Sequence, residues 1–239
     1  MKGKNLLLVG LLSAGLCWSG LAGAAMDTSD NWDDGQLHGW TGNTAWTEVV
    51  GETTGGNPGG YLRSRNSSAT NPSRTIGAMS GENRYTGDFA AAGVQRISVD
   101  LNLLSGQMSW VVLRLRYRDA TFNGWTYQLD TSLPVGQWRH YEVSFDPNWT
   151  DAQAIAAGWQ QESNTPSFQQ TLSDVYSTEV RLLYPSSNVA APPQLGIDNF
   201  HLHAVGAGTT AAVPVLGPAF LATLILGVAF IGYRRLQKA

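Results

Sequence analysis

Alternation of apolar and polar side chains in the middle of the chain constrains its fold most. Between Val94 and Leu103 the residues from Ile97 onward are aliphatic at every second position, with Ser, Asp and Asn between them. The segment from Trp110 to Arg118 repeats the pattern, with Leu113, Leu115 and Tyr117 opposite Arg114, Arg116 and Arg118. A period of two is typical of a strand with one buried face. Both segments are therefore predicted to be strands of an all-β protein.

Weaker versions of the same pattern predict seven more strands and one or two short helices. The strands are expected at Ala45–Val50, Tyr61–Arg65, Arg74–Met79, Trp125–Asp130, Gln137–Phe145, Thr178–Tyr184 and Leu195–His203. The middle strands are expected to continue as a meander through a turn at 133–136. Thr150 can cap a helix over 151–158, and 167–175 can form a second helical turn. The sequence thus predicts one antiparallel β-sandwich from Met26 to Ala204.

Both ends of the chain have the composition of sorting elements. Residues 1–25 combine Lys2 and Lys4, an apolar stretch and Ala-Gly-Ala, as in a secretory signal peptide. Near the other end, a small-residue linker (205–212) leads to 21 uncharged residues from Val213 to Tyr233. That length crosses a hydrocarbon core of about 30 Å as a helix, and the basic residues after it favour a cytoplasmic C-terminus. The sandwich is therefore expected on the outer side of a membrane.

Composition narrows the classes of partner. Between the two ends stand ten basic residues, all Arg, against eighteen acidic ones, a net charge of −8. Such a surface does not suit nucleic acid, whose binding depends on clustered Lys and Arg. The single cysteine, Cys17, lies in the predicted signal peptide, so no disulfide is expected in the sandwich. Eight of the nine Trp lie in the exported part, where sandwich cores use most of them.

Three stretches in order resemble the laminin B (laminin domain IV) family of β-sandwiches, a relative of galactose-binding-like jelly rolls. They are Gly56–Leu62 (GNPGGYL), Tyr85–Phe89 (YTGDF) leading to Ser98–Leu101, and Gly196–Phe200 (GIDNF). The resemblance covers roughly Asn31 to Ala204 and implies a jelly-roll fold without enzymatic activity, as in matrix and secreted proteins. A generic jelly roll outside that family is the alternative.

The C-terminal segment resembles the PEP-CTERM class of bacterial sorting signals. Its Pro-bearing motif, its apolar helix and its terminal basic cluster occur in the order of that class; the motif and cluster residues are Val213, Pro214, Gly217, Pro218, Arg234 and Arg235. The resemblance implies processing by an exosortase-type transpeptidase in a bacterium that makes an extracellular matrix. The motif departs from the class because it lacks the Glu of Pro-Glu-Pro. An ordinary single-span anchor is the alternative.

Two acidic positions are candidates for a structural Ca²⁺ site. In jelly rolls the first and last strands are neighbours, and Asp34 (or Asp33) would face Asp198 there. Ca²⁺ binds carboxylate and carbonyl oxygens, which these loops offer. The alternative is that Asp198 with Asn199 forms a polar bend before the last strand.

Arg114, Arg116 and Arg118 are candidates for binding a polysaccharide. A row of guanidinium groups can bind the carboxylates of an acidic sugar chain. Alternatively, these arginines pair with acidic residues across the sheet, Asp100 being the obvious partner if its strand is adjacent. His201 and His203 share a strand face and could share a metal ion, but the sequence identifies no third ligand, so solvent-facing histidines are the favoured interpretation.

No enzyme motif appears in the chain: there is no G-x-S-x-G, no H-E-x-x-H and no phosphate-binding Gly loop. The leading expectation is a non-catalytic exported protein that acts as a structural or adhesive module of a cell envelope or matrix. The alternative is a Ca²⁺-stabilised, lectin-like carbohydrate-binding module. A polysaccharide-active enzyme is the third alternative. Two carboxylates suffice for a glycosidase, but such enzymes usually need a larger scaffold or a deep groove.

Overall fold

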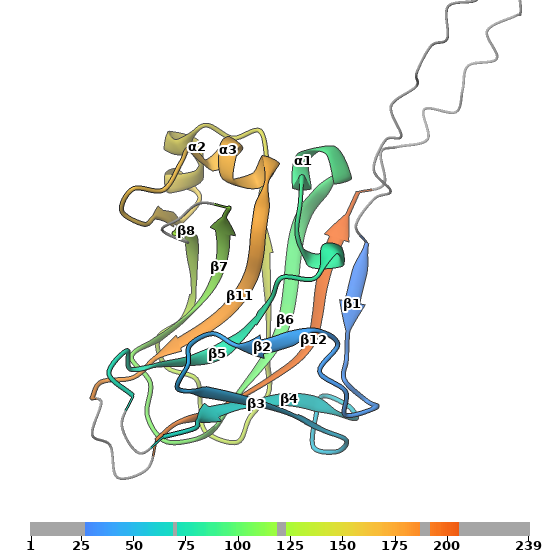
Figure 1. Ribbon diagram of the computed structural model, residues 1–239, viewed down its shortest axis with the longest axis vertical. Coiled ribbons are helices and arrows are strands. Elements are labelled where there is room, and N and C mark those ends of the chain that lie inside the picture. Colours follow the sequence, from blue (N-terminus) through green and yellow to red (C-terminus); the bar gives the residue numbers. More distant parts are fainter. Residues whose placement is uncertain (1–26, 69–70, 119–122, 187–191, 206–239) are drawn as a thin grey trace, which may run out of the picture.

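A computed structural model describes residues 27–68, 71–118, 123–186 and 192–205. Two antiparallel six-stranded sheets pack face to face (Figure 1). Sheet A has the order β3-β4-β12-β6-β9, with β1 pairing with β12; its strands are β1 Thr28–Asp30, β3 Thr47–Glu52, β4 Tyr61–Asn66, β6 Val94–Ser105, β9 Arg139–Ser144 and β12 Gln194–Ala204. Sheet B has the order β10-β8-β7-β11-β5-β2; its strands are β2 Trp40–Gly42, β5 Thr75–Ser80, β7 Trp110–Tyr117, β8 Gly124–Asp130, β10 Trp159–Gln161 and β11 Val175–Leu183.

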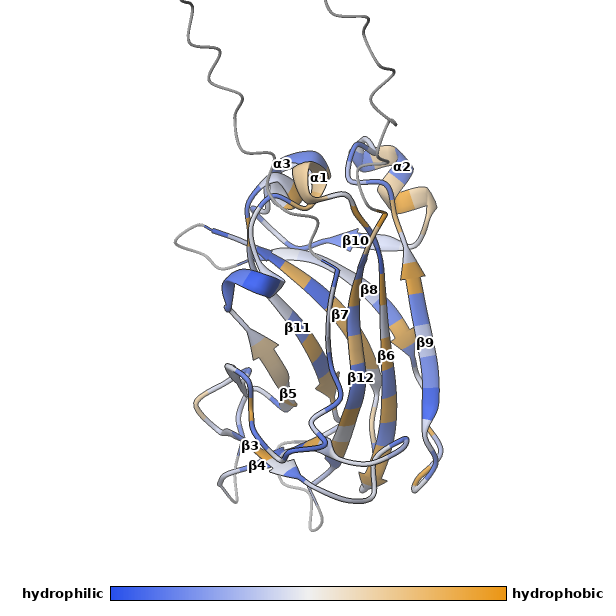
Figure 2. Ribbon diagram, turned by 90° about the vertical axis from the view of Figure 1, so that its right-hand side faces the viewer, coloured by the Kyte–Doolittle hydropathy of each residue, from blue (hydrophilic) through white to orange (hydrophobic). Residues whose placement is uncertain are grey.

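The core lies between the sheets and is formed by the predicted apolar positions. Figure 2 shows hydrophobic and hydrophilic residues alternating along β6 and β12. Ile97, Leu101, Leu113 and Leu115 point inward and are almost fully buried. Four tryptophans join them at 0–1% exposure: Trp32, Trp40, Trp125 and Trp159. Burial of each large side chain contributes roughly 2–3 kcal/mol of transfer free energy, which fits a sandwich without disulfides.

The antiparallel sandwich is confirmed, and of the predicted meander only the pairing of β7 with β8 is confirmed. β6 and β7 are consecutive strands that lie in opposite sheets, and so are β8 and β9. β9 pairs with β6 rather than with β8, with Val99 opposite Tyr141. Alternation fixes which face of a strand is buried, but it does not fix which sheet the strand joins.

The helices lie at one end of the sandwich (Figure 1). α2 (Asp151–Ala156) begins after Thr150, whose hydroxyl accepts a hydrogen bond from the Gln153 N–H as predicted. α3 (Phe168–Ser173) confirms the second helical segment and begins after Ser167. The sequence did not predict α1 (Phe89–Ala92), the 3₁₀ turn η1 (Asn83–Tyr85), or the strands β1, β2 and β10. Each of these elements has three or four residues, too few to show a period.

The predicted signal peptide and the predicted membrane span at 213–233 both lie outside the described residues. Within the described part of the chain, no helix is long and apolar enough to span a membrane.

Candidate functional site

The outer face of sheet B carries an ion-pair network built from adjacent strands. On β7, Arg114 lies opposite Glu179 of β11, and its Nη1 donates a 2.9 Å hydrogen bond to Glu179 Oε2. The other edge of the same guanidinium donates to Glu162 Oε2 from Nη2 at 2.6 Å and from Nε at 2.9 Å. Arg181 binds the second oxygen of Glu162 at 3.1 Å. The network therefore fixes two guanidinium groups in position on this face.

Burial makes this network unusual for a sheet surface. Arg114 is only 8% exposed and Glu179 only 1%, although both point away from the core. Asn43, in the loop after β2, donates a 3.0 Å hydrogen bond to Glu179 Oε1 and covers it. Glu162 is half-buried; burial acts to raise the pKa of its carboxyl, but the hydrogen bonds and charges of Arg114 and Arg181 together lower it. Both carboxylates hold the Arg114 guanidinium in place through these hydrogen bonds.

Arg116 is the next arginine of this row on β7. Its Nη1 lies 3.1 Å from Met79 Sδ, and its guanidinium lies 5.9 Å from the centroid of the Tyr176 ring. Burial, followed by the neighbouring charge of Arg114, lowers the pKa of Arg116, against the pull of Glu179. An incoming anion would relieve that electrostatic cost.

A polar hollow of about 420 Å³ opens at this network. It is lined by Asn43, Thr44, Ser73, Thr75, Arg114, Arg116, Glu179 and Arg181. The guanidinium groups, the carboxylate and the Thr75 hydroxyl belong to the sheet, whereas the other hydroxyl groups and the Asn43 amide come from the loops around it. The volume lies in the range of small-ligand sites, and the lining offers many hydrogen-bond donors.

The sequence found only part of this site. Of the three arginines predicted to bind polysaccharide, Arg114 and Arg116 line the hollow, while Arg118 lies outside it, 61% exposed and 3.5 Å from Asp174. Pairing of these arginines with acidic residues is confirmed for Arg114 and Arg118, but Asp100 is the wrong partner. Asp100 lies in sheet A and contacts His140 at 2.6 Å. Glu162, Glu179, Arg181 and Asn43 were missed because only the fold brings them to β7.

The tryptophans divide between core and surface, as expected of a sandwich. Among the described tryptophans Trp46 is the most exposed, at 40%, and Trp138 packs edge-on against Tyr61. Trp110 lies on the outer face of sheet B, with the Arg181 guanidinium 5.7 Å from its ring centroid. An aromatic side chain thus flanks the network that lines the hollow.

The predicted Ca²⁺ ligands do not meet as a pair. Asp34 bonds His38 Nε2 at 3.0 Å and accepts the Gln36 N–H. Asp198 is fully buried and accepts the backbone N–H groups of Asn57 and Asn199. The structure brings Asp33 rather than Asp34 into the electrostatic range of Asp198. Asp33 is the alternative that the sequence offered to Asp34, so only Asp34 is misplaced, and Ca²⁺ binding stays a prediction.

Asp198 has a perturbed pKa in the folded protein. Burial raises the pKa of Asp198 to about 6, and the charges of Asp100 and Asp33 act in the same direction, against the two backbone hydrogen bonds. Amide groups separate the carboxylates: Asn57 Nδ2 and Asn199 Nδ2 both donate to Asp100 Oδ2. The fold therefore concentrates negative charge beside the 56–60 loop.

No family model matches the chain, and no curated protein matches its sequence. Solved structures of similar shape include a CBM22-1 xylan-binding domain from Paenibacillus barcinonensis Xyn10C, with 16% identity and a TM-score of 0.44, covering 77% of this chain and 97% of that one. A family 11 carbohydrate-binding module from Clostridium thermocellum, in complex with a β-1,3-1,4-mixed-linked tetrasaccharide, has 14% identity and a TM-score of 0.47, covering 74% and 95%.

An exo-β-agarase has 13% identity and a TM-score of 0.49 over 73% of this chain and 24% of that one, so the chain spans about a quarter of the agarase. These likenesses concern shape alone.

Proposed function

We propose that this chain is an exported, non-catalytic module that binds polysaccharide on the outer face of sheet B. The hollow lined by Arg114, Arg116 and Arg181 is the observation that carries the proposal. Hydroxyl and amide groups at its walls match the hydroxyl groups of a sugar chain, and Trp110 offers an aromatic surface beside it.

The charge of the hollow indicates which sugars it would prefer. Three guanidinium groups face two carboxylates there, since Glu162 contacts Arg114 and Arg181, and Glu179 contacts Arg114. Three guanidinium groups thus gather at one place in a domain whose net charge is negative. A guanidinium binds a carboxylate through two parallel hydrogen bonds, which adds geometric selectivity. The preferred ligand is therefore a polysaccharide that carries uronic acids.

The test is retention on immobilised polygalacturonate, compared with a neutral β-glucan. Arg116→Ala should lower retention on the acidic polymer about tenfold and leave the thermal midpoint nearly unchanged. Arg65→Ala is the matched control, because Arg65 is an exposed arginine of sheet A paired with Glu48. Equal retention of the wild type and Arg116→Ala, or equal loss in the control, would overturn the proposal.

A structural or adhesive role without a defined ligand is the second candidate. Complete burial of four tryptophans favours it, since these side chains are then unavailable to a sugar. If the folded wild type is retained on neither polymer, this second candidate is the one supported.

A further inference from the structure

All four histidines of the chain gather on the outer side of sheet A. His38, His140 and His201 line one hollow of about 630 Å³, together with Asp30, Ser98, Asp100 and Asn199. The fourth, His203, packs its ring against that of His201 with centroids 3.7 Å apart. Four histidines spread over 166 positions of sequence reach one surface only through the fold, so this clustering is a tertiary feature.

Two of these histidines meet a carboxylate that the sequence did not identify. His201 and His203 alternate along β12 and point to the same face. Asp27 immediately precedes β1, the strand that pairs with β12, and its Oδ1 lies 2.5 Å from His201 Nε2. One ligand atom from each of Asp27, His201 and His203 lies within 4.8 Å of the other two. Among the described residues, this is the one such group of three.

We propose that Asp27, His201 and His203 bind one divalent transition-metal ion of the class of Zn²⁺. Two imidazoles and a carboxylate are ligands that Zn²⁺ and its neighbours take readily, whereas Ca²⁺ prefers oxygen alone. Three protein ligands leave a coordination position open, as in zinc sites that also bind water or a further ligand. The ion would join the short edge strand β1 to the centre of sheet A.

The surroundings of His203 keep it ready for a metal. Ser98 Oγ lies 2.8 Å from Nε2 and orients the ring, as hydrogen-bonding partners do for metal-bound histidines.

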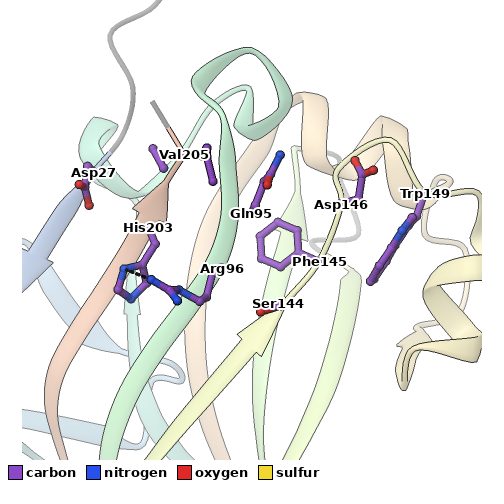
Figure 3. A pocket seen from close by; sticks show the side chains of 10 residues that line it. Asp27, Gln95, Arg96, Ser144, Phe145, Asp146, Trp149, His203 and Val205 are labelled. Carbon is purple, nitrogen blue, oxygen red and sulfur yellow. Dashed lines mark hydrogen bonds between the residues drawn. The ribbon is translucent and has the colours of Figure 1, made fainter. Parts of the chain in front are cut away.

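The other ring nitrogen of His203, Nδ1, carries the lone pair that would bind a metal ion. In Figure 3 a dashed line joins His203 to Arg96, whose Nη2 lies 3.2 Å from Nδ1. Because a guanidinium only donates, Nδ1 accepts and the Nε2 proton goes to Ser98 Oγ. Arg96 is half-exposed and has Glu142 as an alternative partner at 3.5 Å. It can therefore move away from His203 Nδ1 when an ion binds there.

The open position would face a second hollow. Asp27, Arg96 and His203 line a cavity of about 530 Å³ that Phe145 and Trp149 close on its far side (Figure 3). A water molecule or an anionic group bound to the ion has room there.

Calorimetric titration of Zn²⁺ into the protein expressed from its full-length sequence tests the site. One ion per chain should bind, and Asp27→Asn, His201→Gln and His203→Gln should each weaken affinity at least tenfold. His140→Gln is the matched control, since His140 lies on the same face outside the group of three and should leave affinity unchanged. Thermal midpoints of the metal-free variants establish that each one folds.

Co²⁺ gives an independent readout through the visible absorption of a low-coordinate nitrogen and oxygen site. The proposal expects that absorption in the wild type and its loss in His203→Gln. It is overturned if the folded wild type shows neither heat nor absorption. It is also overturned if His140→Gln weakens Zn²⁺ binding as much as His201→Gln, because surface histidines would then bind the ion non-specifically.

Discussion

Asp30 shows how a single buried carboxylate organises the start of the sandwich. Its oxygens accept hydrogen bonds from Trp40 Nε1 at 3.0 Å, Tyr85 Oη at 2.7 Å and Arg84 Nη2 at 2.8 Å. His38 Nδ1 contacts the same group at 2.8 Å. Four donors converge on one 5%-exposed residue, so its charge is neutralised by Arg84 and shared among neutral donors.

Asp30→Asn should therefore destabilise the protein by about 3 kcal/mol or more. The substituted amide places an N–H₂ group against donors and leaves Arg84 without its carboxylate. Urea unfolding measures the loss. Asp34→Asn is the control, because it removes the same charge from an exposed carboxylate that also contacts His38, and its effect should be far smaller. Similar losses in both variants would show that net charge, not the buried donors, matters.

Asp198 should make stability fall as pH rises from about 4 to about 6. Its pKa is raised from 3.8 to about 6 in the folded protein, chiefly by burial, so the folded state binds more protons than the unfolded state in this window. The contribution is full below pH 3.8 and is lost as pH rises through 6, up to about 3 kcal/mol. Comparing urea unfolding of the wild type and Asp198→Asn across pH 4–7 isolates this residue. A constant difference between the two would contradict the assignment.

The ionisation of Asp198 should also control any stabilisation by Ca²⁺. If the ion binds beside Asp33 and Asp198, it should raise the thermal midpoint at pH 7, where Asp198 is ionised, and do so less at pH 5. An unchanged midpoint at pH 7 with millimolar Ca²⁺ would end the Ca²⁺ prediction.

At the scale of single elements, α2 depends on its first turn. Thr150 accepts the Gln153 N–H, and Gln153 Oε1 accepts the Thr150 N–H at 2.8 Å, which satisfies two donors that the helix leaves unpaired. Thr150→Ala should cost about 1 kcal/mol in the free energy of unfolding. Thr150→Ser keeps the acceptor and should cost much less. Equal losses would attribute the effect to the methyl group instead.

Strands were predictable where alternation ran for six residues or more, and their partners were not. The pattern at 97–103 identified β6 and its buried face, since every second side chain had to be apolar. It carried no information on the pairing of β6 with β9 across 40 residues, because that register depends on contacts distant in sequence. Asp27 escaped detection for the same reason: β1 is three residues long, and pairing with β12 alone brings it to His201.

At the scale of the whole molecule, the sorting elements remain proposals that follow from the sequence. If the C-terminal segment is processed after export, the mature protein should lack residues 236–238, and mass spectrometry of the protein isolated from the cells that naturally make it measures this. Retention of Leu236-Gln237-Lys238 would make the segment a lasting membrane anchor. Replacing Pro214 and Pro218 by Ala should block processing if the motif is the recognition element, whereas Pro193→Ala, a change before β12 and outside the motif, should not.

The two proposed sites lie on the outer faces of opposite sheets, and this separation predicts that they act independently. Arg116 points outward from sheet B, whereas His203 points outward from sheet A, and the buried core lies between them. Sites without shared partners have nearly additive effects. His203→Gln should thus abolish Zn²⁺ binding and leave polygalacturonate retention unchanged, and Arg116→Ala should do the reverse. The double variant, measured in both assays, should show the sum of the two losses. A dependence of retention on Zn²⁺ would instead show that the ion bridges protein and polysaccharide, and would move the sugar site to sheet A.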